Sequence, residues 1–79
     1  MKTYEFIGGG RISAENNEQL LTILNQNSLF GYRKFNAWFM HDTAKACKLQ
    51  TGAEIRIGTA DEFIEDLIAN NFLKEIDNA

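Results

Sequence analysis

The sequence predicts an α+β fold, in which two or three helices pack on one face of a small, mostly antiparallel sheet. Three observations lead to this fold class: alternating residues on both sides of a glycine triplet, three stretches with helical spacing of apolar residues, and two further short alternating runs. The expected element order is ββααβαβ. With 79 residues the chain has room for one domain, residues 1–79, and no proline or internal repeat interrupts it.

The first two strands are predicted at residues 3–7 and 11–14, joined by the glycines at 8–10. Tyr4 and Phe6 alternate onto one face of the first strand, and the glycines supply the positive φ that a hairpin turn needs. A glycine triplet after a strand could instead cradle a phosphate. That use requires a helix directly after the glycines and a Lys-Ser or Lys-Thr pair, and the sequence has neither. We therefore predict a hairpin.

Two helices are predicted next, at residues 17–26 and 37–51. Asn16 is placed to cap the first helix, and Asn36 to cap the second. Gly52 follows the second helix and suits its left-handed C-terminal cap.

A third helix begins after Thr59, which forms a capping-box pattern with Glu62, and ends at the asparagines 70–71. Short strands are expected before and after it, at residues 54–57 and 72–76. The predicted core residues come from every element: Phe6, Ile12, Leu24, Met40, Ile55, Ile57, Phe63 and Leu67.

Cysteine usage and the N-terminal sequence predict a cytoplasmic protein. Cys47 is the only cysteine, so no intramolecular disulfide is possible, which fits a reducing compartment. The first residues lack the apolar region of a signal peptide, and no apolar run is long enough to span a membrane.

Catalytic and metal chemistry finds little support in the residue pattern. His41 is followed by Asp42 and lies six positions before Cys47, but neither spacing puts the pair on one side of a helix, so we expect a surface histidine and a buried cysteine. One histidine and one cysteine fall short of a zinc site, and the acidic residues at 61–66 lack the loop and glycine of an EF-hand. The sequence therefore predicts no enzyme, no cofactor and no metal.

Five of the nine aromatic residues lie between positions 30 and 39, which is more than one helix can bury on a single stripe. We expect part of this segment to contact a partner protein, although Tyr32 and Trp38 could instead cover the end of a small core. The predicted partner-binding residues in this segment are Tyr32, Arg33, Lys34, Trp38, His41 and Lys45.

Charge divides the chain into a basic middle and an acidic end. Residues 33–58 hold five Lys or Arg against two acidic residues, and residues 59–79 hold six acidic residues against one Lys. Basic residues beside aromatic ones, at 32–48, also fit a groove for nucleic acid, but the sequence pI of about 5.0 argues against phosphate binding. The acidic helix is either a solvated face or a negative surface that docks on a basic protein through Asp61, Glu62, Glu65 and Asp66.

Three stretches resemble small uncharacterised proteins carried by bacterial phages and conjugative elements, over about half the chain. They are Trp38-Phe39-Met40, then Ala44-Lys45-Ala46-Cys47-Lys48-Leu49-Gln50-Thr51-Gly52-Ala53-Glu54-Ile55-Arg56, then Thr59 to Leu73 with Phe63, Leu67 and Phe72. The resemblance implies a small non-enzymatic inhibitor of a host system, such as an anti-CRISPR protein, and assigns no functional residue.

Together these observations predict a cytoplasmic protein-binding module, a monomer or homodimer, that blocks a partner protein. A small nucleic-acid-binding regulator that uses residues 32–48 is the alternative.

Overall fold

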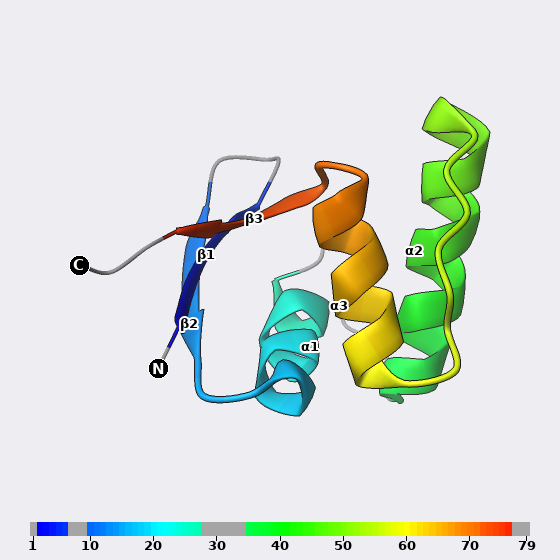
Figure 1. The fold of residues 1–79 in the computed structure, drawn as a ribbon. Coiled ribbons are helices and arrows are strands. Elements are labelled where there is room, and N and C mark those ends of the chain that lie inside the picture. The colour runs from blue at the N-terminus through cyan, green and yellow to red at the C-terminus, as the bar shows by residue number, and fades with distance from the viewer. Residues whose placement is uncertain (1, 7–9, 28–34, 77–79) are drawn as a thin grey trace.

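The computed structural model describes residues 2–6, 10–27 and 35–76, and in it the elements follow the order ββαααβ. The predicted α+β class is confirmed, with a three-stranded antiparallel sheet and three helices on one side of it (Figure 1). The elements are β1 (Lys2–Phe6), β2 (Arg11–Ala14), α1 (Asn17–Gln26), α2 (Asn36–Thr51), α3 (Ala60–Ala69) and β3 (Leu73–Ile76).

The sheet has the strand order β2-β1-β3, so the first strand lies in the middle. Tyr4 lies opposite Ile12 of β2 and opposite Glu75 of β3, and both pairings are antiparallel. The hairpin between β1 and β2 is therefore confirmed, although the predicted turn residues 8–9 lie outside the described residues. Tyr4 faces the helices and is buried, as alternation along the strand requires.

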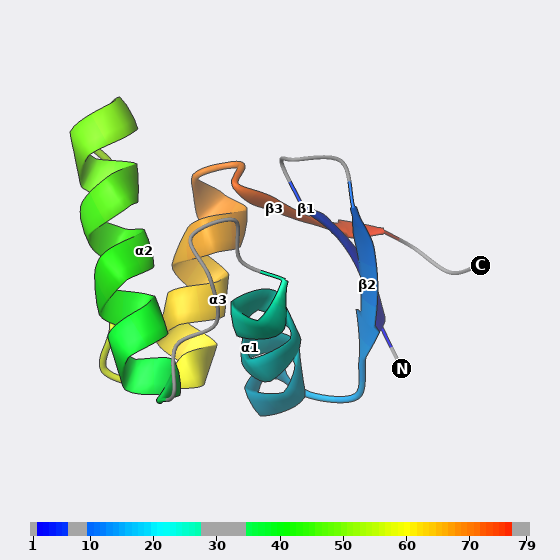
Figure 2. The ribbon, with the colours of Figure 1, turned by 180° about the vertical axis from the view of Figure 1, so that it is seen from behind.

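The helices form two layers beside the sheet. α1 contacts β2, and α3 contacts β3, so these two helices cover the sheet. Figures 1 and 2 show α2 on the far side of α1 and α3, away from the sheet. α2 is joined to the other helices by its contacts with α1 and by an edge-on contact between the rings of Phe39 and Phe63.

The core lies between these layers, and its largest fully buried apolar side chains are Phe63, Leu20, Leu21, Ile64, Leu67 and Leu73. Of the predicted core residues, Leu24, Met40, Phe63 and Leu67 are buried, and Phe6, Ile12 and Ile55 are partly buried against the core. Ile57 was predicted to point inward and is instead 41% exposed.

The predicted strand at residues 54–57 is wrong. Residues 52–57 have no regular secondary structure and run back along α2 toward the start of α3 (Figure 1). The backbone N–H of Arg56 donates to the Asp66 carboxylate at 2.8 Å, so a side chain of α3 takes the hydrogen bond that a neighbouring strand would accept. The missing strand accounts for the difference between the predicted and observed element orders.

Of the two caps predicted for α2, the N-terminal one is wrong and the C-terminal one is confirmed. Phe35 occupies the N-cap position, and Asn36 is the first helical residue. The Asn36 side chain instead joins α1, donating to Thr22 at 3.0 Å and accepting from the buried Asn25 at 3.1 Å. Gly52 ends the helix with φ of 78°, a left-handed conformation that glycine adopts without a steric penalty.

α3 begins and ends where the sequence predicts. The Thr59 hydroxyl accepts from the backbone N–H of Glu62 at 3.1 Å, which is half of the expected capping box, because the Glu62 carboxylate turns to Arg56. Asn71, with φ of 65°, turns the chain toward β3.

Candidate functional site

The predicted partner-binding residues divide between two helices and one undescribed segment. Trp38, His41 and Lys45 lie on α2 and are exposed, and the four acidic residues lie on α3. Tyr32, Arg33 and Lys34 lie outside the described residues. The two described groups are therefore separate surfaces, one aromatic and basic and the other acidic.

Trp38 lies in the first turn of α2 and is 54% exposed. Its ring packs edge-on against Phe35, with ring centroids 4.9 Å apart and an interplanar angle of 89°. Phe35 is itself 51% exposed, so the pair lies at the surface. Between the two alternatives that the sequence leaves open for Trp38, its exposure favours a contact residue over a cover for the core.

Helical geometry places further exposed residues on the same side of α2 as Trp38. The side that faces the protein carries the buried Phe39, Met40 and Cys47. We call the opposite side the α2 outer face. It consists of Trp38, His41, Asp42, Lys45, Lys48 and Leu49, all of which are exposed.

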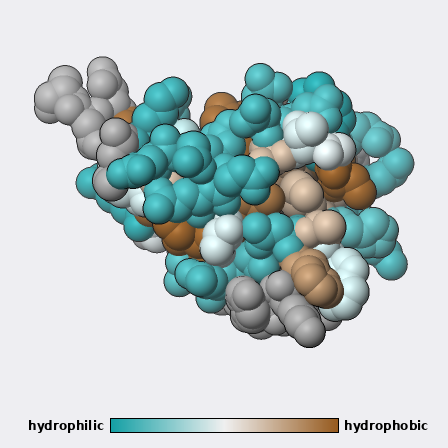
Figure 3. Space-filling view, turned by 90° about the horizontal axis from the view of Figure 1, so that it is seen from below, coloured by the Kyte–Doolittle hydropathy of each residue, from teal (hydrophilic) through white to brown (hydrophobic). Residues whose placement is uncertain are grey.

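Leu49 is the most exposed of the large hydrophobic residues in the described chain, at 79%. It lies three turns along the helix from Trp38, so both ends of the α2 outer face carry an exposed apolar side chain. Seen from below, in Figure 3, the molecule has polar residues over most of its surface, with hydrophobic residues in smaller patches between them.

His41 and Cys47 are not placed to act together, because they lie on different sides of α2. His41 is exposed and Cys47 is buried, as the sequence predicts. Burial raises the pKa of the Cys47 thiol, so the thiol stays protonated and is a poor nucleophile. One detail differs from the prediction: His41 Nδ1 does approach Asp42 Oδ1, at 3.8 Å, a distance too long for a hydrogen bond.

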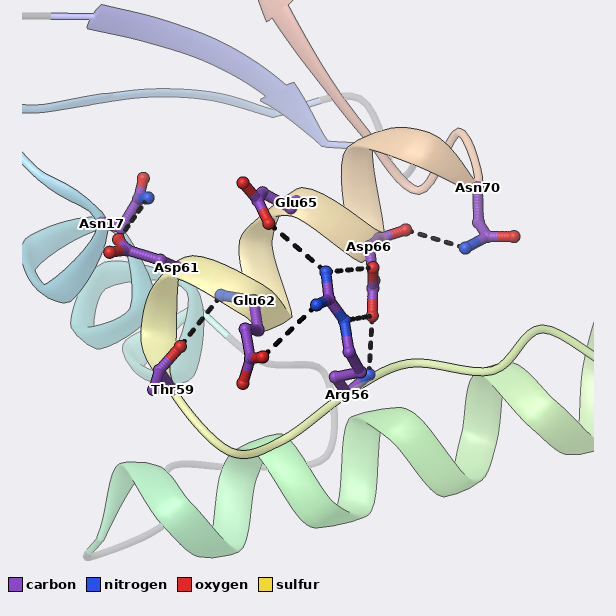
Figure 4. A network of polar contacts seen from close by, with 8 residues as sticks. All are labelled: Asn17, Arg56, Thr59, Asp61, Glu62, Glu65, Asp66 and Asn70. Carbon is purple, nitrogen blue, oxygen red and sulfur yellow. Dashed lines mark hydrogen bonds and ion pairs between the residues drawn. The ribbon is translucent and has the colours of Figure 1, made fainter.

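Glu62, Glu65 and Asp66 of α3 gather around Arg56 (Figure 4). The Arg56 guanidinium donates to both oxygens of Asp66, at 2.9 and 3.0 Å, and also to Glu62 and Glu65, each at 3.3 Å. One arginine thus contacts three carboxylates from two adjacent turns of one helix. These contacts fix the irregular segment 52–57 against α3.

The pairing changes the acid–base properties of both partners. The side-chain hydrogen bond from Arg56, followed by the bond from its backbone N–H, lowers the pKa of Asp66. The same side-chain hydrogen bond raises the pKa of Arg56, which therefore stays charged at any physiological pH. The bidentate geometry is the one that favours arginine over lysine.

Asp61, the fourth predicted acidic residue, is bound separately. Its carboxylate accepts a hydrogen bond from the Asn17 side chain at 2.8 Å, which ties the first turn of α3 to the first turn of α1 (Figure 4). All four predicted acidic residues therefore have partners within the chain. The sequence placed Arg56 in the basic middle and gave no signal that it would bind this cluster.

The described basic residues of segment 33–58 offer little to a phosphate. Arg56 is surrounded by carboxylates, and Lys48 Nζ lies 2.9 Å from Glu54 Oε1. Within the described ranges, Lys45 is the remaining basic residue of segment 33–58, and it forms no ion pair there. The basic balance that suggested nucleic-acid binding is thus mostly compensated internally.

Among the described residues, no group of three or more His, Cys, Asp or Glu side chains is arranged to hold a metal ion. No described helix combines the length and apolar character needed to cross a membrane.

Comparison with known proteins places the chain in no established group: no protein-family model, curated protein or solved structure matches it. The surface features of the chain itself are therefore the guide to its function.

Proposed function

We propose that this chain is a non-enzymatic protein-binding module that blocks a partner protein by covering part of its surface through the α2 outer face. In this proposal it is an accessory protein of a phage or mobile element, and its partner is a protein of the bacterial host, as for an anti-CRISPR inhibitor. The observation that carries the proposal is the half-exposed pair of Trp38 and Phe35 at one end of that face.

Tryptophan in such a position has a large apolar area to lose from water when a partner covers it. Residues of this type dominate the energy of protein interfaces, where a few central side chains account for most of the affinity. His41 and Lys45 lie beside Trp38 on the same face and would form the polar rim. The helix is also the element farthest from the sheet, so a partner could reach it from the side away from the sheet (Figures 1 and 2).

The acidic surface of α3 is a weaker candidate for the contact. Arg56 already neutralises part of the charge of Glu62, Glu65 and Asp66, and a basic partner would have to compete with it. We therefore assign the acidic helix a structural role in fixing segment 52–57.

The test is a capture experiment with matched variants, followed by measurement with the purified partner. Wild type, Trp38→Ala and Ile57→Ala are each used as bait in a nuclease-treated bacterial lysate. Ile57 is the control because it is also a large exposed apolar residue, at 41%, but lies outside α2. Circular dichroism melting curves confirm that all three baits are folded.

A partner of the proposed kind is enriched by wild type and by Ile57→Ala and lost with Trp38→Ala. With the purified partner, Trp38→Ala should weaken binding by about 2 kcal/mol, roughly 30-fold in Kd, while its melting temperature stays within a few degrees of wild type. A Trp38→Ala protein that is folded and binds with full affinity would refute the assignment of this face.

The nucleic-acid alternative is distinguished by salt. Binding through apolar anchors weakens only modestly as salt rises, whereas binding to phosphates gives a steep linear fall of log K with log salt concentration. A nucleic-acid-binding regulator would be supported instead by two results. The bait would capture material only from a lysate without nuclease treatment, and its affinity would fall steeply as the salt concentration rises.

A further inference from the structure

The α2 outer face contains a stripe of four residues, of which the first half carries a negative charge and the second half a positive charge. Its residues are Trp38, Asp42, Lys45 and Leu49, which follow one another at spacings of four, three and four positions. This alternation repeats every seven residues and keeps side chains in one line along a helix, as in the contact seam of a coiled coil. All four residues are exposed, and they lie on the helix farthest from the sheet.

The order of residue types along the stripe is apolar, negative, positive, apolar. If a second α2 lies against the first in the opposite direction, Trp38 of each copy faces Leu49 of the other. Asp42 of each copy then faces Lys45 of the other, so one two-fold axis generates two apolar contacts and two ion pairs. In a parallel, in-register pair the same residues would instead place Asp42 against Asp42 and Lys45 against Lys45, which like-charge repulsion disfavours.

We propose that α2 binds α2 of a second copy of this chain in an antiparallel arrangement, with Trp38 packing on Leu49 and Asp42 pairing with Lys45 across a two-fold axis. A second copy is the expected binding partner of the stripe because the charges of the stripe are complementary to those of its own antiparallel copy. Asp42 also has contacts within its own chain, and the pairing requires only that its side chain, 46% exposed, be reachable by a lysine from outside.

Two further observations are compatible with this pairing. α2 lies on the far side of the molecule from the sheet, so two copies can meet through α2 with their sheets pointing away from each other (Figure 2). Lys48, at the edge of the stripe, is held by Glu54 of its own chain at 2.9 Å, which reduces its repulsion with basic residues of the second copy.

The pairing is expected to be weak and reversible. A seam of four residues from each copy is much smaller than a standard interface of about 20–30 residues a side. Dimers should therefore form in the micromolar range or above and dissociate on dilution. Because the same face carries the proposed contact with a partner protein, a chain cannot be in the dimer and in the partner complex at once.

The test is sedimentation velocity of the full chain over a wide concentration range, using charge exchange across the two-fold axis. The variants are Asp42→Lys, Lys45→Asp and the double variant with both changes, with Lys74→Asp on the exposed surface of β3 as a control. Each single variant places like charges opposite each other twice in the dimer, so its dissociation constant should rise about tenfold or more.

The complementary combinations should restore association. The double variant exchanges both charges and regains the ion pairs. An equimolar mixture of the two single variants should form heterodimers more tightly than either variant forms homodimers. The Lys74→Asp control should associate like wild type. Melting curves of every variant check that the fold is intact.

Three results would overturn the inference: a wild type that stays monomeric up to millimolar concentration, single variants that associate like wild type, or a mixture that fails to recover association. These outcomes are separable from the proposed function, since a chain that binds a partner protein but never dimerises refutes only the pairing. A chain that dimerises as described but binds no partner refutes only the proposed function.

Discussion

Replacing Phe63 with alanine tests whether the core has been placed correctly. The Phe63 side chain is fully buried, at 0% exposure, between α3 and the other elements, and its ring meets Phe39 of α2 edge-on with centroids 6.1 Å apart. Removing a buried phenylalanine ring costs about 3–5 kcal/mol through lost burial and the cavity left behind. The lost ring pair is part of this cost, since such pairs contribute about 0.5–1.5 kcal/mol beyond the buried area.

That cost is comparable with the whole stability of the domain. At roughly 0.05–0.15 kcal/mol per residue, a chain of 79 residues has about 4–12 kcal/mol in total, and small domains lie toward the lower end. Phe63→Ala should therefore be largely unfolded in water at 25 °C.

The assay is urea denaturation followed by circular dichroism, with Leu49→Ala as a control. Leu49 is 79% exposed, so its truncation should change the free energy of unfolding by no more than about 0.5 kcal/mol. A folded Phe63→Ala protein with the same denaturation midpoint as wild type would show that the packing of α2 on α3 has been described incorrectly.

Two further predictions concern α2 and the Arg56 cluster. Gly52→Ala should lower the free energy of unfolding by about 1–2 kcal/mol in a denaturation curve, because the left-handed φ of 78° strains an alanine; an unchanged midpoint would contradict the cap. The pKa of Asp66 is lower in the folded protein than in the unfolded chain, so its stabilising contribution is complete above about pH 5 and is lost as the pH falls through the folded value. Melting temperatures between pH 7 and pH 3 should therefore fall more steeply for wild type than for Asp66→Asn, and parallel curves would argue against the ion pair.

Features set by local sequence were predictable, as α3 shows. Thr59 caps the helix, and Asn71 ends it in a left-handed conformation, because each effect depends on the chemistry of one residue and its immediate neighbours. The buried stripe of Phe63, Ile64 and Leu67 follows from helical spacing in the same way.

Features that depend on distant residues were not predictable. Alternation over residues 54–57 satisfies the pattern of a strand, but Arg56 finds its partners on α3, nine or ten positions away for Glu65 and Asp66. Asn36 has the residue type of a cap, yet its side chain bonds to α1. In both cases a side-chain hydrogen bond to another element outweighs the local preference.

The features of the candidate site were also predictable only where they depend on local sequence. The sequence could identify the aromatic cluster and the charge blocks from composition. It left open whether Trp38 faces the core or the solvent, because helical spacing is ambiguous in a helix that carries apolar residues on several sides. The neutralisation of the acidic helix was missed because it depends on Arg56 folding back from another segment.

The emission of the native tryptophan tests the central claim that the α2 outer face is the contact surface. Trp38 is the only tryptophan, so the fluorescence of this indole reports on that face without any substitution. In dilute solution its emission should be that of a solvent-exposed indole, and it should shift to shorter wavelength, in proportion to complex formed, as the purified partner is added. A partner that binds to saturation with no change in Trp38 emission would contradict the account.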